Sequence, residues 1–108
     1  MAAGLGDIGA HFSDKNKKYK NSDSRFFLRA VREMLRKMKL KIVNVDAVLV
    51  AEKPKLFIYK AEIGANVARE LGIKPSQVNI KAKTHEGLGA LGRNEAIAAH
   101  AIVSLKGN

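Results

Sequence analysis

Ile42-Val-Asn-Val-Asp-Ala-Val-Leu-Val50 is a β-branched segment that is apolar at almost every position. Such a run is typical of a strand that is buried on most of both faces, so helices or a partner must cover it. Asn44 and Asp46 interrupt one of these faces. They are either hydrogen-bonded polar residues at the rim of the strand or the floor of a site, and the pattern leaves both interpretations open.

A helix is expected directly before this strand. Between residues 26 and 38, apolar side chains recur at helical spacing and form one stripe, made of Phe26, Phe27, Ala30, Val31, Met34, Leu35 and Met38. Candidate N-caps stand at its start, namely Ser22, Asp23 and Ser24. The opposite face carries a row of arginines that we interpret as solvent-exposed, Arg25, Arg29, Arg32 and Arg36.

The sequence after the strand predicts a second helix, a second strand and a third apolar segment. Pro54 suits the start of the helix and Gly72 its end. Its buried face is expected to be narrow, with Ile58, Ala61, Ala65, Ala68 and Leu71. Residues 78–84 alternate between apolar and polar as a half-exposed strand does, whereas residues 95–105 fit either a helix or a strand. This order predicts an α/β two-layer sandwich, a mixed sheet with helices packed on one face.

Composition limits the classes of protein that fit. The 108 residues are expected to form a single domain over residues 1–108, and no apolar run approaches the length of a membrane span. The start, Met1 to Asp7, lacks the basic and long apolar regions of a signal peptide. The absence of cysteine excludes disulfides, thiolate metal sites and a cysteine nucleophile. The net charge of +10 predicts an anionic partner, either nucleic acid or a phosphorylated small molecule.

The glycine-rich segment Gly87-Leu-Gly89-Ala-Leu-Gly92 spells two nucleotide-binding patterns. A dinucleotide fingerprint needs an acidic residue about 20 positions further on, and the given chain does not contain one there. The GALG of an RNA-binding KH clamp lies between two helices, whereas this one follows an expected strand. A basic RNA-binding or ribosomal-type module therefore remains only as an alternative that rests on charge, and nucleic acid is an unlikely partner.

Lys83-Thr84-His85-Glu86 stands at the end of an expected strand and opens into this glycine loop. A lysine, a hydroxyl and free loop amides can hold phosphate oxygens, and a neighbouring carboxylate can bind a divalent cation that bridges two phosphates. The three histidines are too dispersed to predict a complete metal site. The combination indicates phosphoryl chemistry, although a purely structural role is an equal alternative.

Five motifs occur in order along the chain. They are Gly4-Leu-Gly-Asp7-Ile8-Gly9-x-x-Phe12-x-Asp14, Asp23-Ser24-Arg25, Asn44-Val-Asp46, Ala51-x-x-Pro54-Lys55, and Val78-Asn-Ile-Lys-Ala-x-Thr84-x-Glu86-Gly-Leu-Gly89 with Gly92-Arg93. From Ala2 to the C-terminus, the sequence resembles the 2-C-methyl-D-erythritol 2,4-cyclodiphosphate synthase family of the non-mevalonate isoprenoid pathway.

The resemblance implies a cytoplasmic lyase, or one in a plastid-like compartment, that forms a homotrimer whose sheets surround a central cavity. Three active sites would lie between neighbouring subunits and bind a cytidine diphosphate ester, 4-diphosphocytidyl-2-C-methyl-D-erythritol 2-phosphate. Its 2-phosphate attacks the β-phosphate, so that CMP leaves and the cyclic diphosphate forms. The implied cofactors are a zinc ion near the β-phosphate and a second divalent ion, Mg²⁺ or Mn²⁺, between the α- and β-phosphates.

The resemblance also assigns substrate-binding residues by position. The ribose or the substrate diol would be held by Asp7, Ile8 and Gly9. The methylerythritol part would be covered by a loop of Phe12, Ser13, Asp14, Lys15 and Asn16. The cytosine pocket would consist of Ala51, Glu52, Lys53, Pro54, Lys55, Leu56 and Phe57.

The phosphate end is assigned in the same way. Thr84 would be the catalytic residue that stabilises the transferring phosphate, and Glu86 would ligate the second metal ion. Ala90 and Arg93 would lie by the phosphate or the trimer axis. The chain departs from common family residues at four positions of these loops, Ser13, Asn16, Lys83 and His85. We expect these departures to tune the loop and the phosphate pocket rather than to change the reaction.

One further departure from the family pattern concerns the zinc ligands and a pair of catalytic residues. The family's zinc ligands, an Asp-x-His and a later His, and a His-Ser pair that assists catalysis all lie upstream of the segment that matches Ala2. None of His11, His85 and His100 occupies a ligand position. The sequence is therefore expected to be an N-terminally truncated synthase domain that has little activity of its own, because zinc positions the attacked phosphate.

Overall fold

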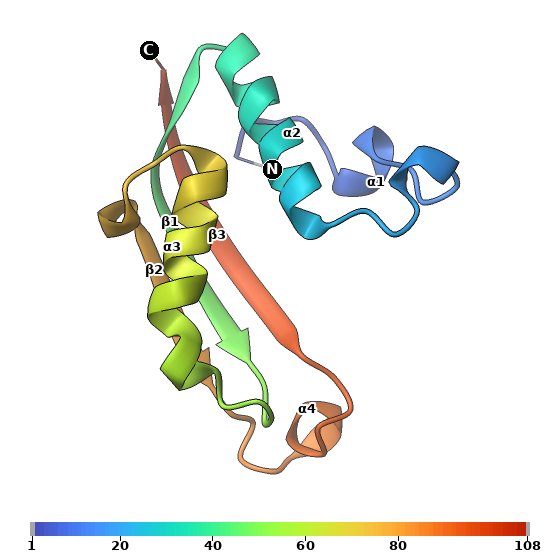
Figure 1. Cartoon of the computed structure of the whole chain (residues 1–108), viewed down its shortest axis with the longest axis vertical. Coiled ribbons are helices and arrows are strands. Elements are labelled where there is room, and N and C mark those ends of the chain that lie inside the picture. Colours follow the sequence, from blue (N-terminus) through green and yellow to red (C-terminus); the bar gives the residue numbers. More distant parts are fainter. Residues whose placement is uncertain (1, 108) are drawn as a thin grey trace.

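A computed structural model of the chain describes residues 2–107, so Met1 and Asn108, the ends of the expected domain, lie outside it. Its centre is a three-stranded sheet in the order β2-β1-β3 (Figure 1). The central strand β1 spans Leu40–Val50 and pairs in parallel with β2, Val78–Lys83. On its other side β1 pairs antiparallel with β3, Ala98–Gly107. The prediction of a mixed sheet is confirmed.

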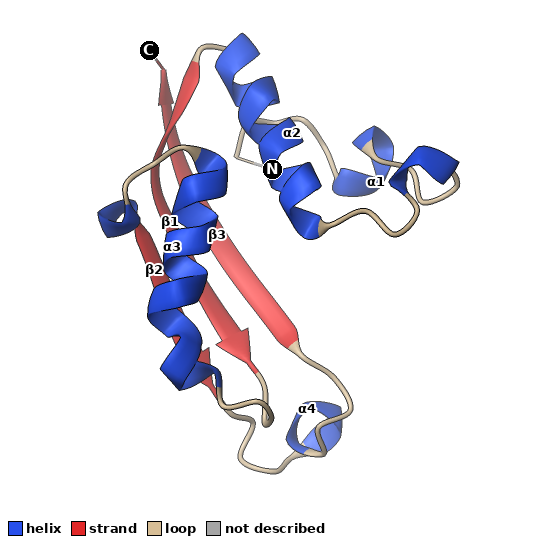
Figure 2. Ribbon diagram, viewed as in Figure 1, coloured by secondary structure: helices blue, strands red, loops and turns tan. Residues whose placement is uncertain are grey.

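Two longer helices lie on one face of this sheet (Figure 2). Helix α2 spans Ser24–Lys37, and α3 spans Lys60–Leu71 and connects the parallel strands β1 and β2. The remaining helices are short: α1 Ile8–His11, η1 Lys17–Tyr19, η2 Leu56–Tyr59, η3 Pro75–Gln77 and α4 Gly89–Gly92. The two-layer α/β arrangement predicted from the sequence is therefore confirmed, with a single helical layer.

The core lies between the helices and the sheet. Val45 and Ile80 are buried in the strands, Leu35 belongs to α2, and Ala68 and Leu71 belong to α3. Val45 and Ala47 pair with Val78 and Ile80 of β2, so residues of one parity on both strands face the helices. The parallel pairing, which runs to Val50 and Lys83, places the carboxyl ends of β1 and β2 side by side.

The opposite face of the sheet has no helix on it within the part of the chain that the structure describes (Figure 1). Ile102 of β3 is 75% exposed there. Asp46 accepts hydrogen bonds from Asn79 Nδ2, at 3.3 Å, and from Lys81 Nζ, at 3.4 Å. Asp46 is thus a hydrogen-bonded polar residue. The sequence predicts that helices or a partner cover β1 on both faces, and the described part of the chain provides this cover on one face only.

The N-terminal segment packs on α2 through an aromatic cluster of Phe12, Tyr19, Phe26 and Phe27. The ring centroids of Phe12 and Phe27 lie 5.1 Å apart, and those of Phe12 and Tyr19 lie 5.6 Å apart, with both pairs close to edge-to-face. This geometry suits the quadrupoles of aromatic rings. Phe26, although part of the predicted buried stripe, is 44% exposed because it faces this segment rather than the sheet.

The second helix differs from its prediction. Pro54 does not start it, because residues 52–54 form bends after β1, η2 follows, and α3 begins only at Lys60. Ala61 and Ala65 are exposed, whereas Gly64, Ala68 and Leu71 are buried. The buried face is therefore rotated from the predicted one and includes Gly64, where an added Cβ atom would lie 3.6 Å from a side-chain carbon of Ile80. Gly72 ends the helix as predicted, in a left-handed conformation with φ of 70°.

Two segments that the sequence left open are now defined. Residues 98–107 form a strand, and the glycine loop contains a turn followed by the single helical turn α4. No helix in the described residues is long and apolar enough to cross a membrane.

Candidate active site at one end of the sheet

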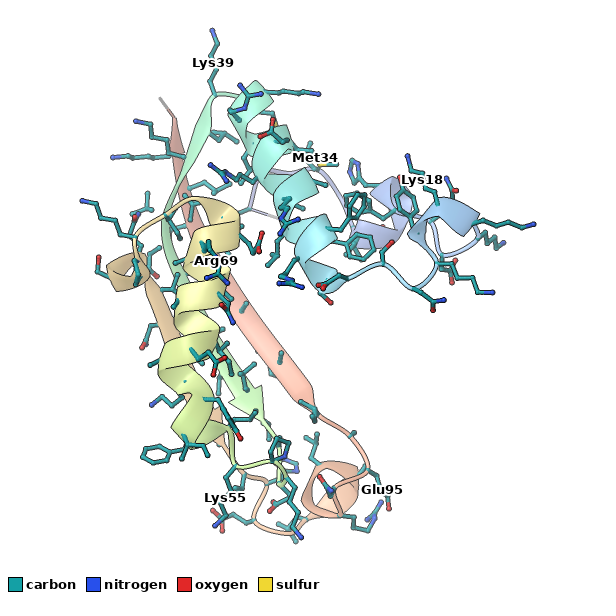
Figure 3. All side chains as sticks on the ribbon, in the orientation of Figure 1. Lys18, Met34, Lys39, Lys55, Arg69 and Glu95 are labelled. Atoms are coloured by element: carbon teal, nitrogen blue, oxygen red, sulfur yellow. The ribbon has the colours of Figure 1, made fainter. Side chains whose placement is uncertain are left out.

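Two loops meet where the parallel strands β1 and β2 end. Residues 51–57 follow β1, and residues 84–93 follow β2 and include α4. The amide of Ala51 donates to the carbonyl oxygen of Lys83 at 3.0 Å, so the ladder between the strands continues to the start of both loops. Figure 3 shows Lys55 and Glu95 at this same end, beside α4. The structure therefore brings together the predicted cytosine and phosphate segments.

Glu52 joins the two loops directly. Its Oε1 accepts hydrogen bonds from the backbone amides of His85, at 3.1 Å, and Gly87, at 3.2 Å. The backbone of this turn is left-handed at Glu86, with φ of 54°, and at Gly87, with φ of 75°. Neighbouring amides that point into one concavity form a nest that attracts anions, and here a carboxylate of the same chain occupies it.

The other amides of this turn also have acceptors. Glu86 N donates to Thr84 Oγ1 at 3.4 Å, and Leu88 N donates to the His85 carbonyl oxygen at 2.9 Å. The expectation of free loop amides for phosphate oxygens is therefore wrong for residues 85–88, because Glu52 and the turn itself bind them. The exposed side chains of Lys83 and Thr84 remain as groups of this segment that can contact an anion, whereas the exposed carboxylate of Glu86 would need a cation between itself and a phosphate.

The loop after β1 presents its side chains to solvent. Lys53, Pro54 and Lys55 are exposed, and Phe57 is 74% exposed. The site formed by one chain is thus an open surface rather than a closed cleft. An open surface binds a charged ligand weakly unless another surface covers it, because solvent screens the charges.

Arg93, the other predicted residue at this end, is held by an ion pair. Its Nε lies 2.7 Å from Oε1 of Glu95, and Ala90 lies in α4 four residues after Glu86. Sequence reasoning did not single out Glu95. The only sequence signal for this contact is the spacing of an acid two residues after an arginine, which is a weak indication.

The N-terminal site residues lie elsewhere. Asp7, Ile8 and Gly9 belong to the start of α1, which packs beside α2 and away from the end of the sheet that carries α4 (Figure 1). Asp7 Oδ1 accepts from Ala10 N at 2.9 Å and so caps α1. The rest of this segment has local hydrogen bonds of the same kind: Lys15 N donates to Ser13 Oγ, and Lys18 N donates to Asn16 Oδ1. One chain does not bring residues 7–16 to the loops at residues 51–57 and 84–93.

Metal ligands are not clustered in residues 2–107, where no three His, Cys, Asp or Glu side chains are placed to hold an ion. His11 Nε2 is 2.7 Å from the Leu5 carbonyl oxygen, His85 Nδ1 is 3.0 Å from the Leu88 carbonyl oxygen, and His100 lies in β3. The residues present do not fit a zinc site. Glu86 is different, because an exposed carboxylate together with substrate phosphates is a usual donor set for Mg²⁺.

The chain is similar in sequence to a family of known proteins. The model of the YgbB family matches residues 1–106. The chain is 52% identical over 101 residues to the 2-C-methyl-D-erythritol 2,4-cyclodiphosphate synthase of Dechloromonas aromatica, covering 94% of this chain and 63% of that protein. It is 50% identical to the Neisseria gonorrhoeae protein of the same name, covering 96% and 65%. The chain thus spans slightly less than two thirds of these relatives.

Solved structures with related sequences also superpose on the chain. The bifunctional IspDF from Campylobacter jejuni superposes with a TM-score of 0.93 at 36% identity, over 99% of this chain and 29% of that one. The CDP complex of IspF from Plasmodium falciparum superposes with a TM-score of 0.81 at 38% identity, over 96% and 61%. These matches give no support to the alternative of a basic RNA-binding or ribosomal-type module.

Proposed function

The chain belongs to the YgbB family, and on this premise we propose that it acts in the synthesis of 2-C-methyl-D-erythritol 2,4-cyclodiphosphate. The observation that carries the proposal is the contact between the two loops at the carboxyl ends of β1 and β2. One loop has Ala51-x-x-Pro54-Lys55 and the other has Thr84-x-Glu86, and Glu52 joins them by two hydrogen bonds. The CDP complex of a structural relative supports a cytidine diphosphate as the ligand.

In the proposed reaction, an oxygen of the 2-phosphate attacks the β-phosphorus of 4-diphosphocytidyl-2-C-methyl-D-erythritol 2-phosphate. A new phosphorus–oxygen bond closes the ring, the bond from the β-phosphorus to the bridging oxygen breaks, and CMP leaves with that oxygen and its electron pair. Lys55 and Lys83 supply positive charge at the loops, and the Thr84 hydroxyl donates a hydrogen bond to the transferring phosphate. Such donors act by stabilising charge that develops in the transition state.

Glu86 is the residue of this chain that would hold a divalent ion, together with α- and β-phosphate oxygens. Mg²⁺ or Mn²⁺ bound there would supply neutralisation of the diphosphate charge. For zinc the described residues supply no ligand set, and no step is assigned to it. Lys53, Pro54, Leu56 and Phe57 are proposed to surround the cytosine, where backbone groups of residues 51–57 can hydrogen-bond the edge of the base.

Self-association is the second part of the proposal: a homotrimer whose sheets face a central cavity. Two observations support it. The uncovered face of the sheet carries a hollow lined by apolar and charged side chains, Asp46, Val48, Lys81, Ala99, His100, Ala101 and Ile102. Residues 7–16 lie apart from the loops that they would complete, so residues 7–16 of a neighbouring copy are proposed to cover the site, with Arg93 and Ala90 near the axis.

The proposal is tested by the metal dependence of nucleotide binding. Glu86→Gln keeps the shape of the side chain and removes its charge, so it should abolish the strengthening of CDP binding by Mg²⁺ and leave CMP binding nearly unchanged. Calorimetric titration with and without Mg²⁺ measures both. Glu62→Gln, at an exposed position of α3, is the matched control. The metal assignment is wrong if Glu86→Gln retains the Mg²⁺ effect in full.

A further inference from the structure

Glu52 has a position that substrate recognition alone does not explain. Its side chain is half-buried, and one oxygen accepts two backbone hydrogen bonds from a segment more than thirty residues away. Charge-assisted bonds of this kind are stronger than neutral ones, so they hold the turn against the loop more firmly than neutral bonds would. These two hydrogen bonds therefore link residues 51–57 directly to the turn at residues 85–87.

The turn that Glu52 holds also positions two proposed functional side chains. Thr84 directly precedes the nest, and its Oγ1 accepts the Glu86 amide. Glu86 has a left-handed backbone, which residues other than glycine rarely adopt and which persists only where neighbouring contacts fix it. Glu52 is one such contact, since it binds the amides on both sides of Glu86.

We propose that Glu52 is a positioning residue that couples recognition of the base to binding of the diphosphate. By occupying the nest, its carboxylate keeps Thr84 and Glu86 at a fixed place relative to the cytosine loop, without contacting the nucleotide itself. The inference rests on the proposed function and replaces the expectation that Glu52 lines the cytosine pocket. The Glu52 carboxylate is the acceptor for the His85 and Gly87 amides, so phosphate oxygens bind elsewhere on the loop.

An alternative role for Glu52 in the same geometry would change CDP binding in the opposite direction. If Glu52 only filled the nest until a phosphate displaced it, the carboxylate would compete with the ligand. Removing it would then strengthen CDP binding, because two free amides would become available and a negative charge would disappear. The two roles therefore differ in the sign of the change, which a titration measures directly.

The experiment compares Glu52→Ala and Glu52→Gln with the unchanged chain and with Glu62→Ala, which removes a carboxylate from an exposed position of α3. CDP and CMP are titrated by calorimetry in Mg²⁺, and amide hydrogen exchange at His85 and Gly87 is followed by NMR. Glu52→Ala should weaken CDP binding about tenfold or more and weaken CMP binding less, because the two amides lose their acceptor. Glu52→Gln keeps an amide oxygen as acceptor, so it should restore slow exchange and CDP binding to within about threefold of the unchanged chain.

The proposal is overturned if Glu52→Ala strengthens CDP binding, if it leaves both exchange and binding unchanged, or if Glu52→Gln is as weak as Glu52→Ala. A thermal melt of each variant separates loss of the contact from loss of the fold. Failure of the unchanged chain to bind CDP contradicts the proposed function instead. In that case the exchange rates at His85 and Gly87 still decide whether Glu52 orders the turn.

Discussion

Gly92 shows how closely the loop after β2 is packed. A Cβ atom at this position would come within 2.7 Å of the Cα atom of Gly87 and still closer to its carbonyl carbon. These are backbone atoms, so the turn has to move to make room. The absence of a side chain at residue 92 is thus a condition for the turn that carries Glu86.

Gly92→Ala should therefore displace the turn at residue 87. We expect a loss of about 1–3 kcal/mol in the free energy of unfolding, as for other overpacked sites, together with weaker CDP binding. Thermal melts and calorimetry measure the two effects. Gly107→Ala is the control, because a Cβ there meets no atom within 4 Å. Equal stability and equal CDP affinity for the two variants would contradict the packing that we describe.

At the scale of single residues, the sequence motifs assigned residues to the candidate site but did not indicate the contacts between them. Thr84, Glu86 and Lys55 were assigned from motif positions, and they do lie at one end of the sheet. The hydrogen bonds of Glu52 were beyond prediction, because they join backbone amides to a carboxylate across more than thirty residues and depend on the left-handed turn. No local pattern in the sequence encodes such a pairing.

Helices α2 and α3 are joined by an ion pair between Arg29 and Glu70. The Nε atom of Arg29 lies 2.5 Å from Oε2 of Glu70, whose side chain is only 7% exposed. The Arg29 guanidinium lowers the pKa of Glu70 below its ordinary value of 4.5. At the start of α2, hydrogen bonds from Arg25 lower the pKa of Asp23 from 3.8 to about 2. The predicted arginine face is thus exposed, but three of its members, Arg25, Arg29 and Arg36, also make ion pairs.

Both carboxylates have lower pKa values in the folded chain than in the unfolded one. Their contribution to stability is therefore complete above the unfolded values, near 4 to 4.5, and is lost as the pH falls through the folded values. The melting temperature should fall between about pH 5 and about pH 2. Glu70→Gln should melt lower at neutral pH and show a shallower decrease over this range. An unchanged pH profile in that variant would rule out the ion pair as a stabilising contact.

At the scale of elements, the sequence predicted the segments whose structure follows from their own hydrophobic pattern. The apolar stripe of α2 and the β-branched run of β1 were both identified, because each repeats with the period of its own structure. Residues 95–105 were ambiguous because alanine favours helix, and only pairing with β1 makes residues 98–107 a strand. The start of α3 was placed too early, since Pro54 suits a turn as well as a helix start.

The uncovered face of the sheet is the main feature of the whole molecule that one chain leaves unexplained. Ile102, 75% exposed, stands beside Asp46 in the middle of this face. If copies of the chain contact one another through this face, a charged side chain in place of Ile102 would have to be buried in the contact, which is unfavourable. The sequence predicted that β1 needs cover, and for this face the described part of the chain provides none.

Ile102→Lys should therefore reduce self-association. Sedimentation velocity of the unchanged chain should show concentration-dependent growth toward a trimer, and the variant should remain smaller at the same concentration. Glu62→Gln, which removes one negative charge, raises the net charge by the same single unit on the helical side and serves as the control. A stable monomer of the unchanged chain at all concentrations would contradict association through this face.

The most direct test of the account is the base selectivity of nucleotide binding, because it examines the loop after β1 apart from metal and turnover. CDP and UDP carry the same diphosphate and differ only in the base, so charge alone binds them equally. We expect calorimetry in Mg²⁺ to find saturable CDP binding that is about tenfold tighter than UDP binding, because hydrogen bonds to the edge of the base distinguish the two. Equal affinities for CDP and UDP would contradict recognition of the base by this loop.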